Sequence, residues 1–293
     1  MINYNPKSWL GMIFHLTKSD TLQILWKELV MIFAFTLLIA VVELHYFPKA
    51  TVLDKLFPVY QILGFVMSLL LVFRTNTAYE RWWEGRRKWG ELVNDSRNMA
   101  VKIAALELDE ETNSFFARHI GNFAKACKEH LREGVNFEIL NLTEEEILFL
   151  RKVDHIPSGI VELMYLRFNQ LKKSGALSEE DILRLDRNLN GFLDSVGACE
   201  RIKNTPIPYS YSMFFKKFIF IYVVTLPLAF VVNFGYFSSI ISTFIFYVFV
   251  SLEILAEEIE DPFGTDDNDL PTDQMTERIE GIVTTILLKT AEN

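Results

Sequence analysis

Hydrophobic and polar residues are segregated along this chain into long uncharged runs separated by charged stretches. The sharpest run extends from Leu56 to Phe73 and ends at Arg74. Its eighteen residues are long enough to cross the hydrocarbon of a bilayer as a helix. A basic, Trp-rich segment at residues 74–89 follows, as is typical of a cytosolic membrane interface. This boundary predicts a membrane-spanning helix and its orientation.

The same pattern predicts four spans, at about residues 29–47, 56–73, 218–234 and 238–252. The last two share one uncharged stretch, which at about 1.5 Å per residue is too long for a single crossing. The segment from Asn233 to Tyr236 is the expected break between them. Pro227 is expected to kink the third span, at a cost that packed neighbouring helices absorb.

Basic residues set the expected topology. Lys18 and Lys27 precede the first span, the run at 74–88 follows the second, and Lys216 with Lys217 precedes the third. Both termini, residues 74–217 and residues 253–293 are therefore expected in the cytosol. No cleavable signal peptide is expected, because no small-residue cleavage site follows the first apolar run.

The long middle segment is predicted to be helical. Apolar residues recur at helical spacing between Phe115 and Leu131, and Gly134 is expected to end that helix. Two capping pairs are expected to start further helices, Thr143 with Glu146 and Ser178 with Asp181. No alternating strand pattern appears. The sequence therefore predicts an all-α fold over residues 1–293, a single unit whose cytosolic helices continue the spans.

Composition fits a protein that lies partly in lipid and partly in water, with 50% apolar and 23% charged residues. The net charge of −9 argues against nucleic-acid binding. Cys127 and Cys199 lie in the predicted cytosolic segment, outside any CxxC spacing, and are expected to be reduced. The signature motifs of phosphate-binding loops, dinucleotide sites, metalloproteases and serine hydrolases are absent. The sequence therefore predicts no enzyme.

The five histidines are scattered along the chain. His119 and His130 share a predicted helix, but eleven positions separate them. Such a pair is more often a surface or packing pair than a metal site.

The second span carries a stripe of Phe65, Leu69 and Phe73, which recur every four residues and share one helical face. One interpretation is packing against lipid or the protein core. The other is a ring of apolar side chains around a constriction, where dewetting gates ions. Gly64 and Ser68 lie near the stripe and would permit a close helix approach.

An acidic segment from Glu253 to Asp273 contains nine carboxylates and no basic residue. Oxygen ligands at this density suit a hard cation such as Ca²⁺, although the spacing is not that of an EF-hand. A solvated turn that caps helices and an acidic vestibule that concentrates cations are the alternatives. The tryptophans near residue 82 are expected as interface anchors, and the neighbouring arginines are suited to anionic lipid heads.

Three motifs follow one another along the chain. They are Phe73-Arg74-Thr75-Asn76 through Tyr79-Glu80-Arg81-Trp82-Trp83-Glu84, Gly197-Ala198-Cys199-Glu200-Arg201-Ile202 with Asn204-Thr205-Pro206-Ile207-Pro208, and Glu260-Asp261-Pro262-Phe263-Gly264 with Asp266, Asp267 and Asp269. Together they resemble the bacterial branch of the bestrophin family. The resemblance implies a homopentameric ion channel with one axial pore. It also implies that Phe65, Leu69 and Phe73 line the narrow neck of that pore.

The resemblance implies a second constriction, a cytosolic aperture formed by one residue of a later helix. Ungapped counting places it at Glu180, with Leu183 one turn along as the alternative; an apolar residue is usual there. Glu258, Asp266 and Asp269 match positions that hold Ca²⁺ in animal bestrophins. The alternative to calcium binding is that these acids only buttress the neck. No cofactor is expected to be required.

The function expected from the sequence is passive ion conduction by a bestrophin-type pentamer in the inner membrane of a bacterium. The family implies chloride and other anions, while a channel for monovalent cations such as sodium is the alternative. A membrane scaffold that binds lipid, and a metal-dependent enzyme that uses the acidic turn, are alternatives of other classes. The expected partners are copies of the same chain, membrane lipids and permeant monovalent ions.

Overall fold

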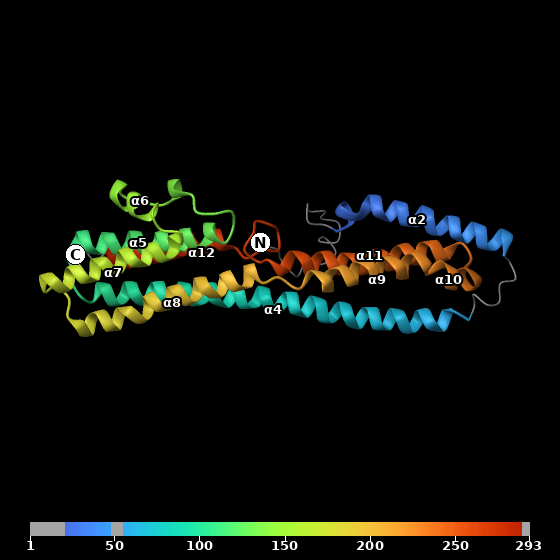
Figure 1. The fold of residues 1–293 in the computed structure, drawn as a ribbon, viewed down its shortest axis with the longest axis horizontal. Coiled ribbons are helices and arrows are strands. Elements are labelled where there is room, and N and C mark those ends of the chain that lie inside the picture. The colour runs from blue at the N-terminus through green and yellow to red at the C-terminus, as the bar shows by residue number, and fades with distance from the viewer. Residues whose placement is uncertain (1–20, 48–54, 289–293) are drawn as a thin grey trace. The chain divides into compact units, whose positions relative to one another are not determined.

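The computed structural model describes residues 21–47 and 55–288, and these residues form helices and turns without a strand. The α-helices are α2 (Thr21–Tyr46), α4 (Phe57–Ala104), α5 (Glu110–His130), α6 (Glu144–Leu150), α7 (Ile156–Ser174), α8 (Glu179–Asn204), α9 (Tyr209–Thr225), α10 (Pro227–Phe234), α11 (Phe237–Glu260) and α12 (Thr272–Leu288) (Figure 1). A 3-10 turn at Phe137–Ile139 precedes α6. The predicted all-α fold is confirmed.

Four of these helical segments are long and apolar enough to cross a membrane: α2, α4, α9 with α10, and α11. They coincide with the four predicted spans. The first helix begins at Thr21, eight residues before the predicted span, because Lys27 and Glu28 do not interrupt backbone hydrogen bonding. The second runs on to Ala104 without a break, so that apolar and charged stretches share one 48-residue helix.

The structure shows the interruption predicted at Pro227 in the third span and the break predicted between the third and fourth spans. The helix is interrupted beside Pro227, where Leu226 keeps right-handed helical dihedral angles and the chain continues as α10. Gly235 then reverses the chain with a φ of +53°, a conformation that side chains with a Cβ rarely adopt. The α11 helix begins two residues later.

The described residues group into two compact units. The span unit comprises residues up to Arg81, Pro206–Glu260 and Asp266–Asn268; the bundle unit comprises Trp82–Thr205, Asp261–Thr265 and the described residues from Asp269. In the span unit, α11 packs along α2 and also contacts α9 and α10. Three serines of α11, Ser238, Ser239 and Ser242, are buried, and small residues of this kind let membrane helices approach closely.

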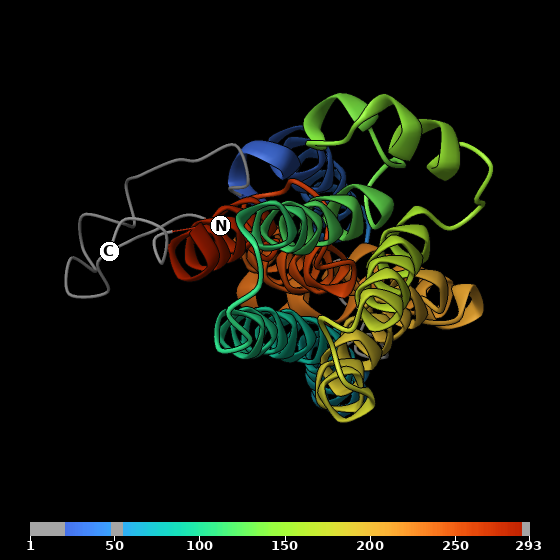
Figure 2. The same cartoon turned by 90° about the vertical axis from the view of Figure 1, so that its left-hand side faces the viewer.

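In the bundle unit, α5 packs against both α12 and α7, and α7 packs against α8 (Figure 2). Buried aromatic rings link these helices. Phe123 of α5 stacks on Phe192 of α8 with centroids 4.9 Å apart, and Phe116 lies 5.1 Å from Phe168 of α7. Burying each such ring contributes about 1.5–3 kcal/mol. These contacts fix the middle parts of α5, α7 and α8 relative to one another.

The helix boundaries of the bundle follow from local signals in the sequence. Thr143 and Glu146 form the predicted capping box of α6, and Ser178 with Asp181 forms that of α8. α5 ends at His130, four residues before the predicted Gly134. A turn follows, and at Gly134 the chain adopts a φ of +112°, with the Gly134 N–H donating to Glu129 O at 3.0 Å.

Candidate functional site

The predicted neck stripe is exposed along the apolar part of α4. The exposed fractions are 70% for Phe65, 46% for Leu69 and 54% for Phe73. On the opposite face of the same turns, Met67 and Leu71 are buried. The stripe therefore does not pack in the core of its own subunit, and packing against the protein core is excluded. It faces lipid, another chain or a pore.

Arg74 follows the stripe and points the other way, into the span unit, where its side chain is fully buried. Its Nη2 donates to Glu260 Oε2 at 2.7 Å, and its Nε lies 3.7 Å from Glu253 Oε2. Both acids belong to α11. Since a buried charge is costly without a partner, this group fixes α4 against α11 at the level of Phe73.

Glu260 connects segments that are far apart in sequence. Its second carboxylate oxygen accepts the Ile207 N–H at 2.6 Å, and its backbone carbonyl accepts the Arg81 Nε–H at 3.0 Å. Arg74 and Arg81 belong to the first of the three sequence motifs, Ile207 to the second and Glu260 to the third. The three motifs therefore meet at one carboxylate beside the stripe.

Gly64 permits a close helix approach, as predicted. A Cβ at this position would lie 2.6 Å from Tyr222 Oη of α9, and the same hydroxyl donates to Tyr60 O at 3.1 Å. Ser68 instead donates to Gly64 O within α4. The close contact between α4 and α9 lies behind the exposed stripe.

The two candidate aperture residues lie in the first turns of α8, within the bundle unit. Both Glu180 and Leu183 are exposed, and the exposed fraction of Leu183 is 67%. The register of the aperture stays a prediction.

The acidic turn between α11 and α12 has an internal structure. Glu258 accepts a hydrogen bond from Asn268 Nδ2 at 2.6 Å within the span unit, and Asp266 lies in the same turn. Within the bundle unit, Asp269 is buried, and a Cβ on Gly264 would lie 2.7 Å from its Oδ2. Calcium binding by these acids stays a prediction.

Phe263 of the third motif packs in the core of the bundle unit and is 1% exposed. A Cβ on Gly85 would lie 3.1 Å from its ring and 3.2 Å from Pro262. The residue that directly follows the first motif is therefore in contact with the third motif, and a side chain at position 85 would push the two segments apart.

The chain matches the family described as Bacterial/Fungal Bestrophin protein over residues 1–285. It belongs to the bestrophin family. Among curated relatives of this bestrophin is a voltage-dependent anion channel-forming protein of Ralstonia nicotianae, 32% identical over 94% of this chain and 90% of the relative. The channel-forming protein of the same description from Escherichia coli K12 is 31% identical over 96% and 92%.

Solved structures agree with this assignment. A bacterial bestrophin homologue from Klebsiella pneumoniae superimposes with a TM-score of 0.82 at 26% identity, over 88% of this chain and 97% of that one. A point mutant of a Klebsiella pneumoniae homologue gives a TM-score of 0.83 over 90% and 99%. This bestrophin is therefore an ion channel of the membrane, and its family and relatives are channels, not enzymes.

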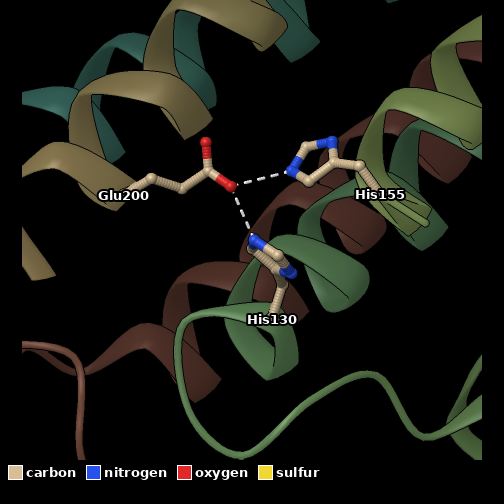
Figure 3. Close-up of side chains that lie close together, drawn as sticks. All are labelled: His130, His155 and Glu200. Carbon is tan, nitrogen blue, oxygen red and sulfur yellow. Dashed lines mark hydrogen bonds and ion pairs between the residues drawn. The ribbon is translucent and has the colours of Figure 1, made fainter. Parts of the chain in front are cut away.

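Two groups of this bestrophin were missed by sequence reasoning. One is the buried set of Arg74, Glu253 and Glu260; its signal was that an ionisable residue, Arg74 or Glu253, directly follows the second and the fourth predicted spans. The other is in the bundle unit, where His130 and His155 both contact Glu200 (Figure 3). The interpretation of the histidines as scattered was wrong for this pair, because helix packing brings together positions that linear spacing does not relate.

Glu146 and the two cysteines of the bundle unit have shifted pKa values. Burial raises the pKa of Glu146, but hydrogen bonds from His119, Arg118 and the Thr143 N–H outweigh it and hold this pKa below its usual range. Burial raises the pKa of Cys199 to about 12 and that of Cys127 well above its ordinary value. Both cysteines are buried and free, as expected of reduced thiols.

Proposed function

We propose that this bestrophin is a homopentameric channel for passive conduction of anions, chloride among them, across the inner membrane of a bacterium. The observation that carries the proposal is the exposed stripe of Phe65, Leu69 and Phe73. Buried Arg74 directly follows it and pairs with Glu260, which fixes this part of α4 against α11. Apolar side chains in water are unfavourable, so such a stripe needs lipid or a narrow, dewetted pore around it.

The rigid backing favours the pore over lipid. A lipid-facing stripe needs only apolar character, whereas a constriction needs side chains held at fixed positions. Arg74, Glu253 and Glu260 supply this positioning directly after Phe73. In a symmetric pentamer, each of the three residues would form one ring around the axis, and Phe73 would form the cytosolic end of the neck.

Anion conduction is proposed from the channel-forming relatives, whose names describe anion channels. Rings of apolar side chains do not replace a hydration shell, so selectivity would be coarse and would follow the charges near the pore. Two observations favour monovalent cations, sodium among them, as the second candidate. They are the net charge of −9 and the exposed carboxylate of Glu180 at the proposed aperture.

Planar-bilayer recording of the purified protein under a salt gradient tests the proposal. A reversal potential near the chloride equilibrium potential supports anion conduction, and one near the sodium equilibrium potential supports the second candidate. Absence of current at every voltage would contradict the channel and favour a lipid-binding scaffold. Native mass spectrometry tests the pentamer, and cysteine accessibility at residue 2 from either side of the membrane tests the cytosolic N-terminus.

Conduction without a bound cofactor is part of the proposal. The resemblance offers calcium at Glu258, Asp266 and Asp269 as the alternative. Recording the same currents with calcium chelated and then restored separates the two. Currents that persist under chelation support a channel that requires no cofactor.

A further inference from the structure

Three helices of the bundle unit bring potential metal ligands to one point. His130 is the last residue of α5, His155 immediately precedes α7, and Glu200 lies in the C-terminal half of α8. His130 Nε2 is 2.6 Å from Glu200 Oε1, and His155 Nε2 is 2.9 Å from the same oxygen (Figure 3). The two imidazole planes are perpendicular, with centroids 4.7 Å apart. Two nitrogens and one oxygen therefore converge from different directions.

Contacts that do not involve these ligands hold them in place. The Lys203 ammonium donates to the backbone carbonyls of Leu131 and Arg132, which binds the end of α5 to α8 beside His130. The Arg201 guanidinium pairs with Glu84 at 2.7 Å and fixes α8 against α4 next to Glu200. The three ligands are therefore positioned by the fold and need no ion to bring them together.

The three side chains are also accessible to an ion from solution. Their exposed fractions are 29% for His130, 30% for His155 and 29% for Glu200. Cys127 and Cys199 are different, because both are buried and out of reach of an ion from solution. The available ligand set is therefore two imidazoles and one carboxylate, without sulfur.

His155 has a partner that suits a metal ligand. Its Nδ1 accepts the Ser158 N–H at 3.2 Å and lies 2.5 Å from Ser158 Oγ. Coordination through Nε2 requires the ring proton to move to Nδ1, where the Ser158 hydroxyl oxygen would accept it. A hydrogen-bond acceptor at the ring nitrogen that does not bind the metal fixes the tautomer of a metal-bound histidine. The cost is the loss of the Ser158 N–H bond that now caps α7.

We propose that His130, His155 and Glu200 bind one divalent transition-metal ion, with zinc as the best match. Two histidines, one carboxylate and an open fourth position for water form an established zinc ligand set. Zinc–ligand bonds of about 2.0–2.1 Å place ligands about 3.3 Å apart in a tetrahedron. The carboxylate oxygen, now 2.6 Å from His130 Nε2 and 2.9 Å from His155 Nε2, therefore needs to move away from each nitrogen by only about 0.4–0.7 Å on binding. The site would cross-link α5, α7 and α8, and it does not depend on whether the chain conducts ions.

Zinc titration of the purified, tag-free, chelator-treated protein against a fluorescent zinc indicator tests the proposal. We expect one saturable site per chain, and we expect His130→Gln and Glu200→Gln to weaken its affinity at least tenfold. His45→Gln, an exposed histidine of α2, and Glu179→Gln, an exposed carboxylate at the opposite end of α8 from Glu200, are matched controls that should retain the affinity. Equal zinc affinity in the wild type and the two ligand variants would overturn the proposal, as would the absence of saturable binding.

A second measurement does not require the variants to fold. Cobalt bound to the wild-type protein should give the intense visible absorption of a tetrahedral nitrogen–oxygen site, and zinc should abolish it. Calcium in large excess should leave it unchanged, because imidazole is a poor ligand for a hard cation. Zinc should also raise the melting temperature of the wild type. The site would be contradicted by a spectrum that shows nothing but the weak absorption of hexahydrated cobalt. It would also be contradicted by displacement of the bound cobalt by calcium.

Discussion

The Arg74 guanidinium lies 2.7 Å from the Glu260 carboxylate, although 186 positions separate the two residues in sequence. The pair joins the end of the proposed neck to the end of α11. Because Arg74 is fully buried, loss of the Glu260 charge leaves its guanidinium with one remaining carboxylate, Glu253, at the longer distance of 3.7 Å. Breaking a buried pair of this kind costs about 3–5 kcal/mol.

Glu260→Gln is therefore expected to lower thermal stability in detergent and to change channel open probability. Glu257→Gln is the matched control, because Glu257 lies one turn earlier on α11 and forms a 2.6 Å pair with Lys216 in which both side chains are over 40% exposed. Exposed pairs contribute about 0–1 kcal/mol, so the control should behave like the wild type. Thermal unfolding and bilayer recording of both variants provide the comparison.

Alanine at Phe65, Leu69 or Phe73 is expected to widen the apolar constriction and hydrate it. Single-channel conductance or open probability should rise roughly twofold or more. Phe220→Ala on α9 removes an equally exposed ring from another span and should leave conductance unchanged. If the three α4 variants conduct like the wild type, the stripe faces lipid and the proposed neck is elsewhere.

Charge at the aperture is expected to bias ion selectivity. Glu180→Gln removes a carboxylate from the first turn of α8 and should move the reversal potential toward the chloride equilibrium potential. Glu179→Gln is the control, since the adjacent carboxylate pairs with Lys172 at 3.2 Å. If Leu183→Ala alone alters the current, the aperture lies at that position and the ungapped register is wrong.

Glu146 is expected to make stability depend on pH. Its pKa is lower in the folded protein than the ordinary value of 4.5, so its contribution is complete above that value and is lost as the pH falls below it. Glu146→Gln should cost about 2–3 kcal/mol at pH 7, because Arg118 loses charged bonds of 2.5 and 2.9 Å.

Thermal unfolding of the wild type and Glu146→Gln at neutral and acidic pH measures this effect. The difference between them should shrink as the pH falls below 4.5. Glu91→Gln removes an exposed partner of Lys88 and should show no such dependence. A constant difference at every pH would mean that the Glu146 carboxylate adds nothing through its charge.

The elements that the sequence predicts correctly depend on local physics. The α6 and α8 starts follow from capping pairs three residues apart, and the turn at Gly235 follows from a break in a run too long for one crossing. The neck residues were predicted from periodicity and family resemblance, and the structure adds only that their side chains are exposed.

The elements that the sequence did not reveal depend on tertiary packing. Forty-five positions separate His155 from Glu200, and no spacing rule relates them; only the packing of α7 on α8 does. The partners of Arg74 lie on a helix almost two hundred positions away. In both cases the residue types were visible, but the partners were not.

The opposed directions of Phe73 and Arg74 limit how the proposed neck can open. A twist of α4 that swings the Phe73 ring aside also draws the neighbouring guanidinium away from Glu253 and Glu260, at a cost of several kcal/mol. Thermal motion rarely supplies that much energy. The neck can therefore change width by rotamer changes of its own rings or by displacement of whole subunits, but not by independent rotation of the helix that carries it.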